Sequence, residues 1–128
     1  MSTMAPTYSV TSDLAHQRID FAASGFFDTP TMKAFLRQID GAAQPLVASG
    51  KPFTALGTMS GLTPQSGEVV ETIARHLQAA RAAGLMRVAI VDAPPMLALQ
   101  YRRAAGDLTV EFFEEDAAAR RWLADDPA

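Results

Sequence analysis

The sequence contains no cysteine, which excludes a disulfide framework, a thiolate nucleophile and a cysteine-ligated metal site. With only two histidines, a histidine-ligated zinc enzyme is not expected either. The 11 Lys and Arg residues are outnumbered by 14 Asp and Glu, giving a formal net charge of −3. This balance provides no cationic surplus to displace counterions from nucleic acid. We therefore expect no metal, no cofactor and no nucleic-acid partner.

Long apolar segments are also missing. No run approaches the ~20 residues that a membrane helix requires, and residues 1–6 lack the basic and apolar regions of a signal peptide. The 128 residues are 48% hydrophobic and 20% charged, which is typical of one folded globular domain. We expect a single cytoplasmic domain over residues 1–128, with loose tails at 1–6 and 125–128.

The N-terminal part predicts a hairpin followed by a helix. Residues 8–11 and 18–21 have strand-like patterns, and the second alternates polar and apolar side chains. Residues 28–30, Asp-Thr-Pro, provide a helix cap and a proline suited to the first turn. Apolar residues at helical spacing follow, and a glycine and a proline weaken the end of the pattern. The helix is expected to end near Ala43 or to continue through Val47.

The middle of the chain predicts a strand, a loop, a long helix and a second strand. Residues 53–57 predict a short strand, and residues 58–63 predict a loop rich in Gly, Ser and Thr. The Thr-Pro pair at the end of this loop predicts the start of a long helix that Gly84 terminates. The continuous apolar run 88–91 is typical of a central strand that is covered on both faces.

The C-terminal part completes an alternating pattern. A helix from about Met96 to Ala105 precedes a strand at 108–112 and a final helix from residue 115 or 116. The predicted order is ββαβαβαβα. Helices between successive strands imply an α/β fold with a mixed, largely parallel sheet of about five strands, about four helices and right-handed crossovers.

Core motifs of the C-terminal third resemble the SpoIIAA-like family. These motifs are the strand Arg-Val-Ala-Ile-Val at 87–91, the short helix after it, the strand Val-Glu-Phe-Phe at 110–113, and the Ala118 to Trp-Leu helix that ends at Leu123. The element order over residues 8–124 also fits. The resemblance implies a STAS-like fold, which is also compared with the lipid-binding CRAL-TRIO fold. It further implies no known catalysis, and roles in ligand binding or membrane association.

The sequence departs from STAS anti-sigma-factor antagonists in one motif. Those proteins carry a phosphorylatable serine in an Asp-Ser-Ser-Gly-like turn before a helix. The corresponding residues 57–63 keep Ser60 before a glycine but lack the aspartate and the paired serines. This difference argues against partner switching through Ser60.

Residues 57–67 are also a candidate anion site. They are expected to form a loop that leads into a helix N-terminus, where free backbone amides favour anions. Walker and dinucleotide-binding glycine spacings are absent. The simpler interpretation is a flexible turn followed by a helix cap. The alternative is a phosphate or phosphoserine site at Ser60, Thr63 or Ser66.

Other polar residues have simpler structural interpretations. His16 and His76 lack a nearby acid or serine that would complete a catalytic relay, so each is expected to be a satisfied or surface histidine. The acids at 114–116 complement the dipole at the start of a helix. Because no nucleophile, base and orienting group can be named together, we expect the domain not to be an enzyme.

The helix near 95–105 has more apolar residues than a single buried face requires. It either packs on the sheet through Leu97 and Tyr101, or it is a mobile lid over an apolar pocket, a membrane contact or a protein contact. The candidate contact residues are Met96, Leu97, Leu99, Tyr101, Arg102 and Arg103.

Two functions from different classes follow. The first is binding of an apolar or amphipathic, lipid-like ligand, or of a membrane surface, through the helix near 95–105. The second is a STAS-type regulatory module that binds a protein partner through the loop at 57–67. The sequence leaves the ligand, the partner and the oligomeric state open, including a homodimer.

Overall fold

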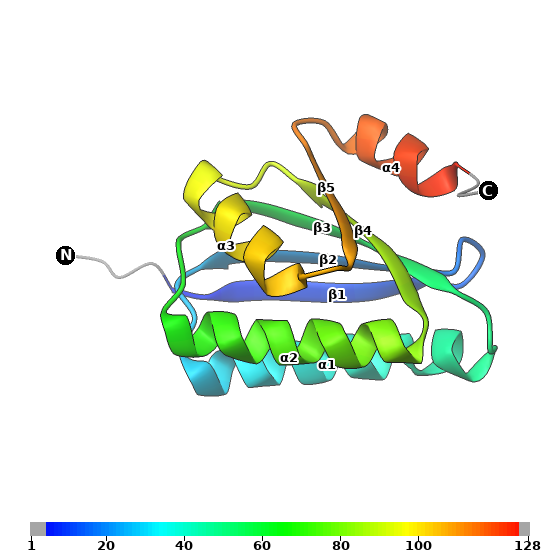
Figure 1. Ribbon diagram of the computed structural model, residues 1–128, viewed down its shortest axis with the longest axis horizontal. Coiled ribbons are helices and arrows are strands. Elements are labelled where there is room, and N and C mark those ends of the chain that lie inside the picture. The colour runs from blue at the N-terminus through cyan, green and yellow to red at the C-terminus, as the bar shows by residue number, and fades with distance from the viewer. Residues whose placement is uncertain (1–4, 126–128) are drawn as a thin grey trace.

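The computed structural model describes residues 5–125 and contains the nine elements in the predicted order (Figure 1). The elements are β1 (Thr7–Asp13), β2 (Arg18–Gly25), α1 (Thr29–Ala48), β3 (Phe53–Leu62), α2 (Gly67–Ala83), β4 (Leu85–Val91), α3 (Pro95–Ala105), β5 (Thr109–Phe113) and α4 (Asp116–Ala124). Of the tails expected at 1–6 and 125–128, residues 1–4 and 126–128 lie outside the described residues. Within the described part of the chain, no helix is long and apolar enough to cross a membrane.

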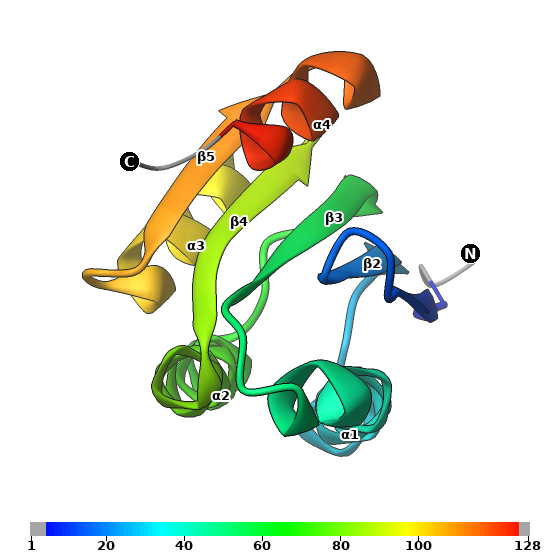
Figure 2. The same ribbon diagram turned by 90° about the vertical axis from the view of Figure 1, so that its right-hand side faces the viewer.

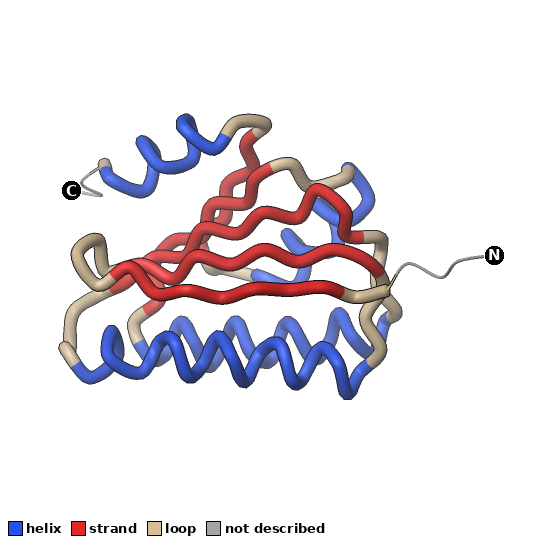
Figure 3. Tube along the Cα trace, turned by 180° about the vertical axis from the view of Figure 1, so that it is seen from behind, coloured by secondary structure: helices blue, strands red, loops and turns tan. Residues whose placement is uncertain are grey.

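The strands form one mixed sheet in the order β1-β2-β3-β4-β5. β1 is antiparallel to β2, and every other neighbouring pair is parallel. Because β2 to β5 follow one another in space as in sequence, right-handed crossovers place α1, α2 and α3 on the same face. Figures 2 and 3 show α1 and α2 along one side of the sheet and α4 on the opposite side, near β4 and β5.

The cap predicted for α1 is confirmed. The Asp28 side chain accepts a hydrogen bond from the Thr31 backbone N–H at 2.8 Å, and Pro30 lies in the first turn. The helix continues past Pro45 to Ala48, which is the longer of the two predicted alternatives. Proline costs one backbone hydrogen bond here, but the next residue, Leu46, is completely buried in the core.

The loop predicted at 57–67 is wrong for its first half. β3 continues to Leu62, because Thr58 pairs with both neighbouring strands and Gly61 pairs with Ser24 of β2. Backbone pairing with β2, joined by β4 as far as Thr58, thus overrides a composition that locally favours a loop. The helix start predicted at Thr63-Pro64 is also wrong, since α2 begins at Gly67 and Ser66 is its cap.

Two apolar layers cover the two faces of the sheet. The larger lies under α1, α2 and α3, and the smaller joins α4 to β3 and β4 through Leu56, Ala89 and Leu123. Arg87 fastens α4 to the sheet by donating hydrogen bonds to the carbonyl oxygens of Trp122, Leu123 and Asp125. Asp125, which the sequence assigned to the tail, is therefore bound at its backbone. The helical layer opposite α4 contains the candidate site.

Candidate ligand-binding cavity

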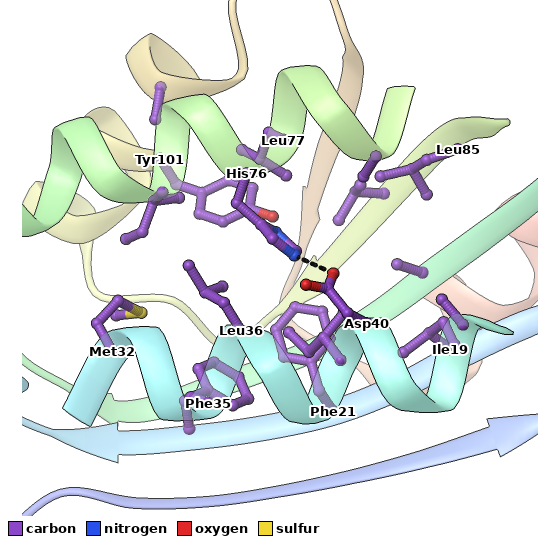
Figure 4. Close-up of a pocket in the computed structure, with 18 of the residues that line it drawn as sticks. Ile19, Phe21, Met32, Phe35, Leu36, Asp40, His76, Leu77, Leu85 and Tyr101 are labelled. Carbon is purple, nitrogen blue, oxygen red and sulfur yellow. Dashed lines mark hydrogen bonds and ion pairs between the residues drawn. The ribbon is translucent and has the colours of Figure 1, made fainter. Parts of the chain in front are cut away.

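A cavity of about 340 Å³ lies among α1, α2, α3 and the sheet (Figure 4). Its volume is near the lower end of the ~300–1,000 Å³ that is typical of small-molecule sites. Most of the lining side chains are aliphatic or aromatic, and they come from three helices and three strands. They include Ile19, Phe21, Phe35, Leu36, Met59, Leu77, Leu85 and Leu97.

Small residues on facing elements leave this space open. Ala55 of β3, Ala43 of α1 and Ala80 of α2 all line the cavity. Gly57 of β3 lies directly against Phe21, and a Cβ atom at residue 57 would overlap the Phe21 ring. The missing side chain at Gly57 therefore allows the Phe21 ring to lie close to the sheet, where it forms part of the cavity wall.

The space between α1 and α2 is bridged by one polar pair. His76 Nε2 of α2 lies 2.7 Å from Asp40 Oδ1 of α1 (Figure 4). The His76 side chain is 16% exposed and that of Asp40 is 60% exposed, so the pair lies where the cavity meets solvent. The sequence interpretation of His76 as a satisfied or surface histidine did not identify this partner. The two residues are 36 positions apart, and no motif relates them.

Helix α3 divides the six residues that the sequence selected as one contact site. Leu97 and Tyr101 are buried and line the cavity. Met96 and Leu99 are 62% and 46% exposed and point away from the core. Arg102 and Arg103 are also exposed, and the Arg102 guanidinium lies 4.9 Å from the centre of the Phe112 ring of β5. The inner and outer residues of α3 therefore belong to different surfaces.

Two glutamines close the end of the cavity beside α3. Gln65 is buried, and its side chain accepts from the Phe27 N–H at 3.0 Å and donates to the Gly25 carbonyl at 3.4 Å. Gln100 of α3 bonds in turn to the backbone of Gln65. Both glutamines line the cavity, but their amides are already engaged with the protein. The sequence analysis did not identify either residue, since a lone glutamine carries no motif.

The three residues of the candidate anion site, Ser60, Thr63 and Ser66, do not form one binding site. Ser60 is exposed on β3. The Thr63 hydroxyl donates to the Gly25 carbonyl at 3.3 Å, and the Ser66 hydroxyl accepts from the Val69 N–H at 3.3 Å. The two residues nearest the helix are thus occupied by local hydrogen bonds, and Ser60 lies on a strand rather than in a loop.

Other titratable groups lie away from the cavity or are paired locally. His16 is paired with Asp13 at 2.8 Å in the turn between β1 and β2. Asp116 pairs with Arg120 within α4. Within residues 5–125, no three His, Asp or Glu side chains cluster closely enough to hold a metal ion. Burial raises the pKa of Tyr101, so its hydroxyl stays protonated at neutral pH.

Comparison with known proteins addresses the fold. No protein-family model matches the chain, and no curated protein matches it. Among solved structures, it is similar to an uncharacterized protein of the DUF3478 family from Shewanella loihica PV-4, which has a SpoIIAA-like fold. The TM-score is 0.69 at 17% sequence identity, over 97% of this chain and 98% of the other. The chain thus has the SpoIIAA-like α/β fold, as its core motifs predicted.

Proposed function

We propose that this domain binds a small apolar or amphipathic ligand in the cavity among α1, α2, α3 and the sheet, and that it is not an enzyme. The observation that carries the proposal is a cavity of about 340 Å³ lined mainly by hydrophobic side chains. Water gains little in such a space, because it needs two to four polar partners. An apolar ligand gains about 25 cal/mol for each Å² of apolar surface that it removes from water.

A ligand would reach this cavity from solvent between α1 and α2, while α3 forms one of its walls. Ile39 of α1 and Ile73 of α2 are half-buried cavity-lining residues, and Val47 is 37% exposed. Apolar side chains therefore extend from the cavity toward solvent between the two helices. The helix near 95–105 contributes a wall through Leu97 and Tyr101, and its mobility remains a prediction.

Contact with a membrane surface would use a different part of α3. Met96 and Leu99 are exposed, with Arg102 and Arg103 further along the helix. Leu99→Asp should then weaken binding to anionic liposomes and leave ligand binding in the cavity unchanged. Loss of both activities would show that α3 acts as one continuous site.

A STAS-type regulatory role remains the alternative prediction. It would use Ser60, which is exposed on β3. If the domain has such a role, Ser60→Asp should change the binding of a protein partner and leave ligand binding in the cavity unchanged.

The proposed function is tested by native mass spectrometry of the purified protein, compared with its denatured mass. A releasable excess of a few hundred daltons would identify a retained ligand. If none is retained, calorimetric titration with n-butylbenzene measures binding to the cavity directly. Absence of both a retained ligand and n-butylbenzene binding would overturn the proposal.

A pair of variants on α2 locates the binding. Ala80→Phe places a large side chain at a cavity-lining position and should abolish binding. Ala82→Phe makes the same change at an exposed position outside the cavity lining, and should bind as the native protein does. Equal affinities in the two variants would place the ligand elsewhere.

A further inference from the structure

Tyr101 brings an unused hydrogen-bond donor to the cavity. The residue is 8% exposed and lines the cavity, and its side chain reaches from α3 toward the space between α1 and α2 (Figure 4). Among residues 5–125 its hydroxyl has no hydrogen-bond partner, and it is open to the cavity, since it is not one of the fully enclosed unpaired atoms. A buried tyrosine hydroxyl usually has a partner. A ligand in this cavity would supply that partner.

The charges around the cavity determine which ligands fit. No Lys or Arg is among the described lining residues, and Asp40 brings a carboxylate to the solvent side. His76 is already paired with that carboxylate. An anionic head group would therefore lose hydration without gaining a free cation. A cationic head group would meet only the largely exposed Asp40, where ion pairs contribute about 0–1 kcal/mol.

The volume limits the size of the ligand. A volume of about 340 Å³ lies near the lower end of the ~300–1,000 Å³ of small-molecule sites, so the cavity suits a small molecule rather than a long-chain lipid. Apolar walls from α1, α2 and the sheet would surround most of such a molecule.

We propose that the ligand is a neutral, mainly aliphatic molecule with one hydrogen-bond acceptor, such as a ketone, that accepts the proton of the Tyr101 hydroxyl. This inference rests on the proposed ligand-binding function. It specifies the charge and the polar group of the ligand, and it assigns Tyr101 as the residue that recognises that group. By the same argument, an alkyl carboxylate should bind more weakly than a neutral ligand of the same length.

Calorimetric titration of the full chain at neutral pH tests this assignment with three probes of matched size. Heptyl methyl ketone carries an acceptor, n-butylbenzene carries none, and nonanoate is anionic. Tyr101→Phe removes only the hydroxyl. Because a neutral hydrogen bond contributes about 0.5–1.5 kcal/mol, the variant should bind the ketone about twofold to twelvefold more weakly. Its affinity for n-butylbenzene should be unchanged, and nonanoate should bind the native protein more weakly than the ketone.

The only other tyrosine provides a matched control. Tyr8 of β1 is half-buried and is not a cavity-lining residue, so Tyr8→Phe should leave the ketone affinity unchanged. Equal ketone affinities in the native protein and Tyr101→Phe would overturn the role of the hydroxyl. Tighter binding of nonanoate than of the ketone would overturn the neutral class. In both cases n-butylbenzene binding would still support the cavity, whereas failure of all three probes would refute the proposed function itself.

Discussion

The side chain of Gln100 forms two hydrogen bonds with the backbone of Gln65. Its Nε2 donates to the Gln65 carbonyl oxygen at 2.9 Å, and its Oε1 accepts from the Gln65 N–H at 2.8 Å. The Gln65 side chain in turn contacts the backbone of Gly25 and Phe27 at the end of β2. The middle of α3 is thereby joined to the connection between β3 and α2, and through it to β2. This chain of contacts fixes the wall of the cavity that α3 provides.

Removing the Gln100 amide should loosen α3. Gln100→Ala leaves the N–H and carbonyl of Gln65 without these partners, which costs about 1–3 kcal/mol of unfolding free energy. Hydrogen exchange should become faster in α3 and remain slow in residues 88–91 of β4. Arg103→Ala, at an exposed position of the same helix, is the control. Unchanged exchange in Gln100→Ala would mean that the pair does not hold α3.

Replacing glycine by alanine should lower stability at Gly57 and raise it at Gly41. In Gly57→Ala the new Cβ overlaps the Phe21 ring, so the ring must move within the cavity wall. Such overpacking costs about 1–3 kcal/mol of stability and should weaken ligand binding. In Gly41→Ala no atom lies within 4 Å of the new Cβ. That variant should gain about 0.5–1 kcal/mol from the helix preference for alanine.

Urea unfolding of both glycine variants, together with n-butylbenzene titration, checks this difference. The same sign of stability change at both positions would contradict the close packing of Phe21 on Gly57.

Arg87 should determine how firmly α4 is held. Its guanidinium bonds to three carbonyl oxygens at the end of α4 and lies 4.9 Å from the centre of the Trp122 ring. Because hydrogen bonds to charged groups contribute about 1.5–3 kcal/mol, Arg87→Leu should lower the free energy of unfolding by about that much.

Trp122 is the only tryptophan, so its fluorescence reports on α4 directly. The emission of Arg87→Leu should shift to the red as the indole becomes exposed to water. Arg121→Leu, on the exposed side of α4, should leave the emission unchanged. An unshifted spectrum in Arg87→Leu would show that α4 is held by its apolar residues alone.

The cap of α1 should make stability depend on pH in the acid range. Hydrogen bonding by Thr31, through its side chain and its backbone, lowers the pKa of Asp28. A carboxyl whose folded-state pKa is lowered stabilises the fold above its unfolded-state pKa, which is about 3.9 for Asp. That contribution is lost as the pH falls below about 4 and through the lower folded-state value.

Urea midpoints of the native protein and of Asp28→Asn, measured from pH 6 down to pH 2.5, test this dependence. The native protein should be the more stable at pH 6, and the difference should shrink as Asp28 becomes protonated. If the difference in urea midpoint between the native protein and Asp28→Asn is the same at every pH, ionisation of Asp28 does not stabilise the fold.

Local signals in the sequence determined the order of the elements and several of their ends. Asp28 and Pro30 mark the start of α1, and Gly84 ends α2 with a φ of 124°, a conformation that favours glycine. Four of the five fully buried residues of α1, namely Met32, Phe35, Leu36 and Ala43, follow the helical spacing of apolar residues in the sequence. These features depend on neighbours within a few residues, and the sequence therefore contains them directly.

The tertiary structure alone decided the length of β3 and the position of the cavity. β3 extends to Leu62 because β2 supplies pairing partners as far as that residue, whereas β4 pairs only as far as Thr58, and no local pattern encodes these partners. The cavity arises because right-handed crossovers bring three helices to one face, where Gly57 and several alanines leave space. Asp40 meets His76, and Tyr101 reaches the same space, only through this packing. Contacts between residues that are far apart in the chain depend on how the elements assemble, and sequence periodicity describes each element by itself.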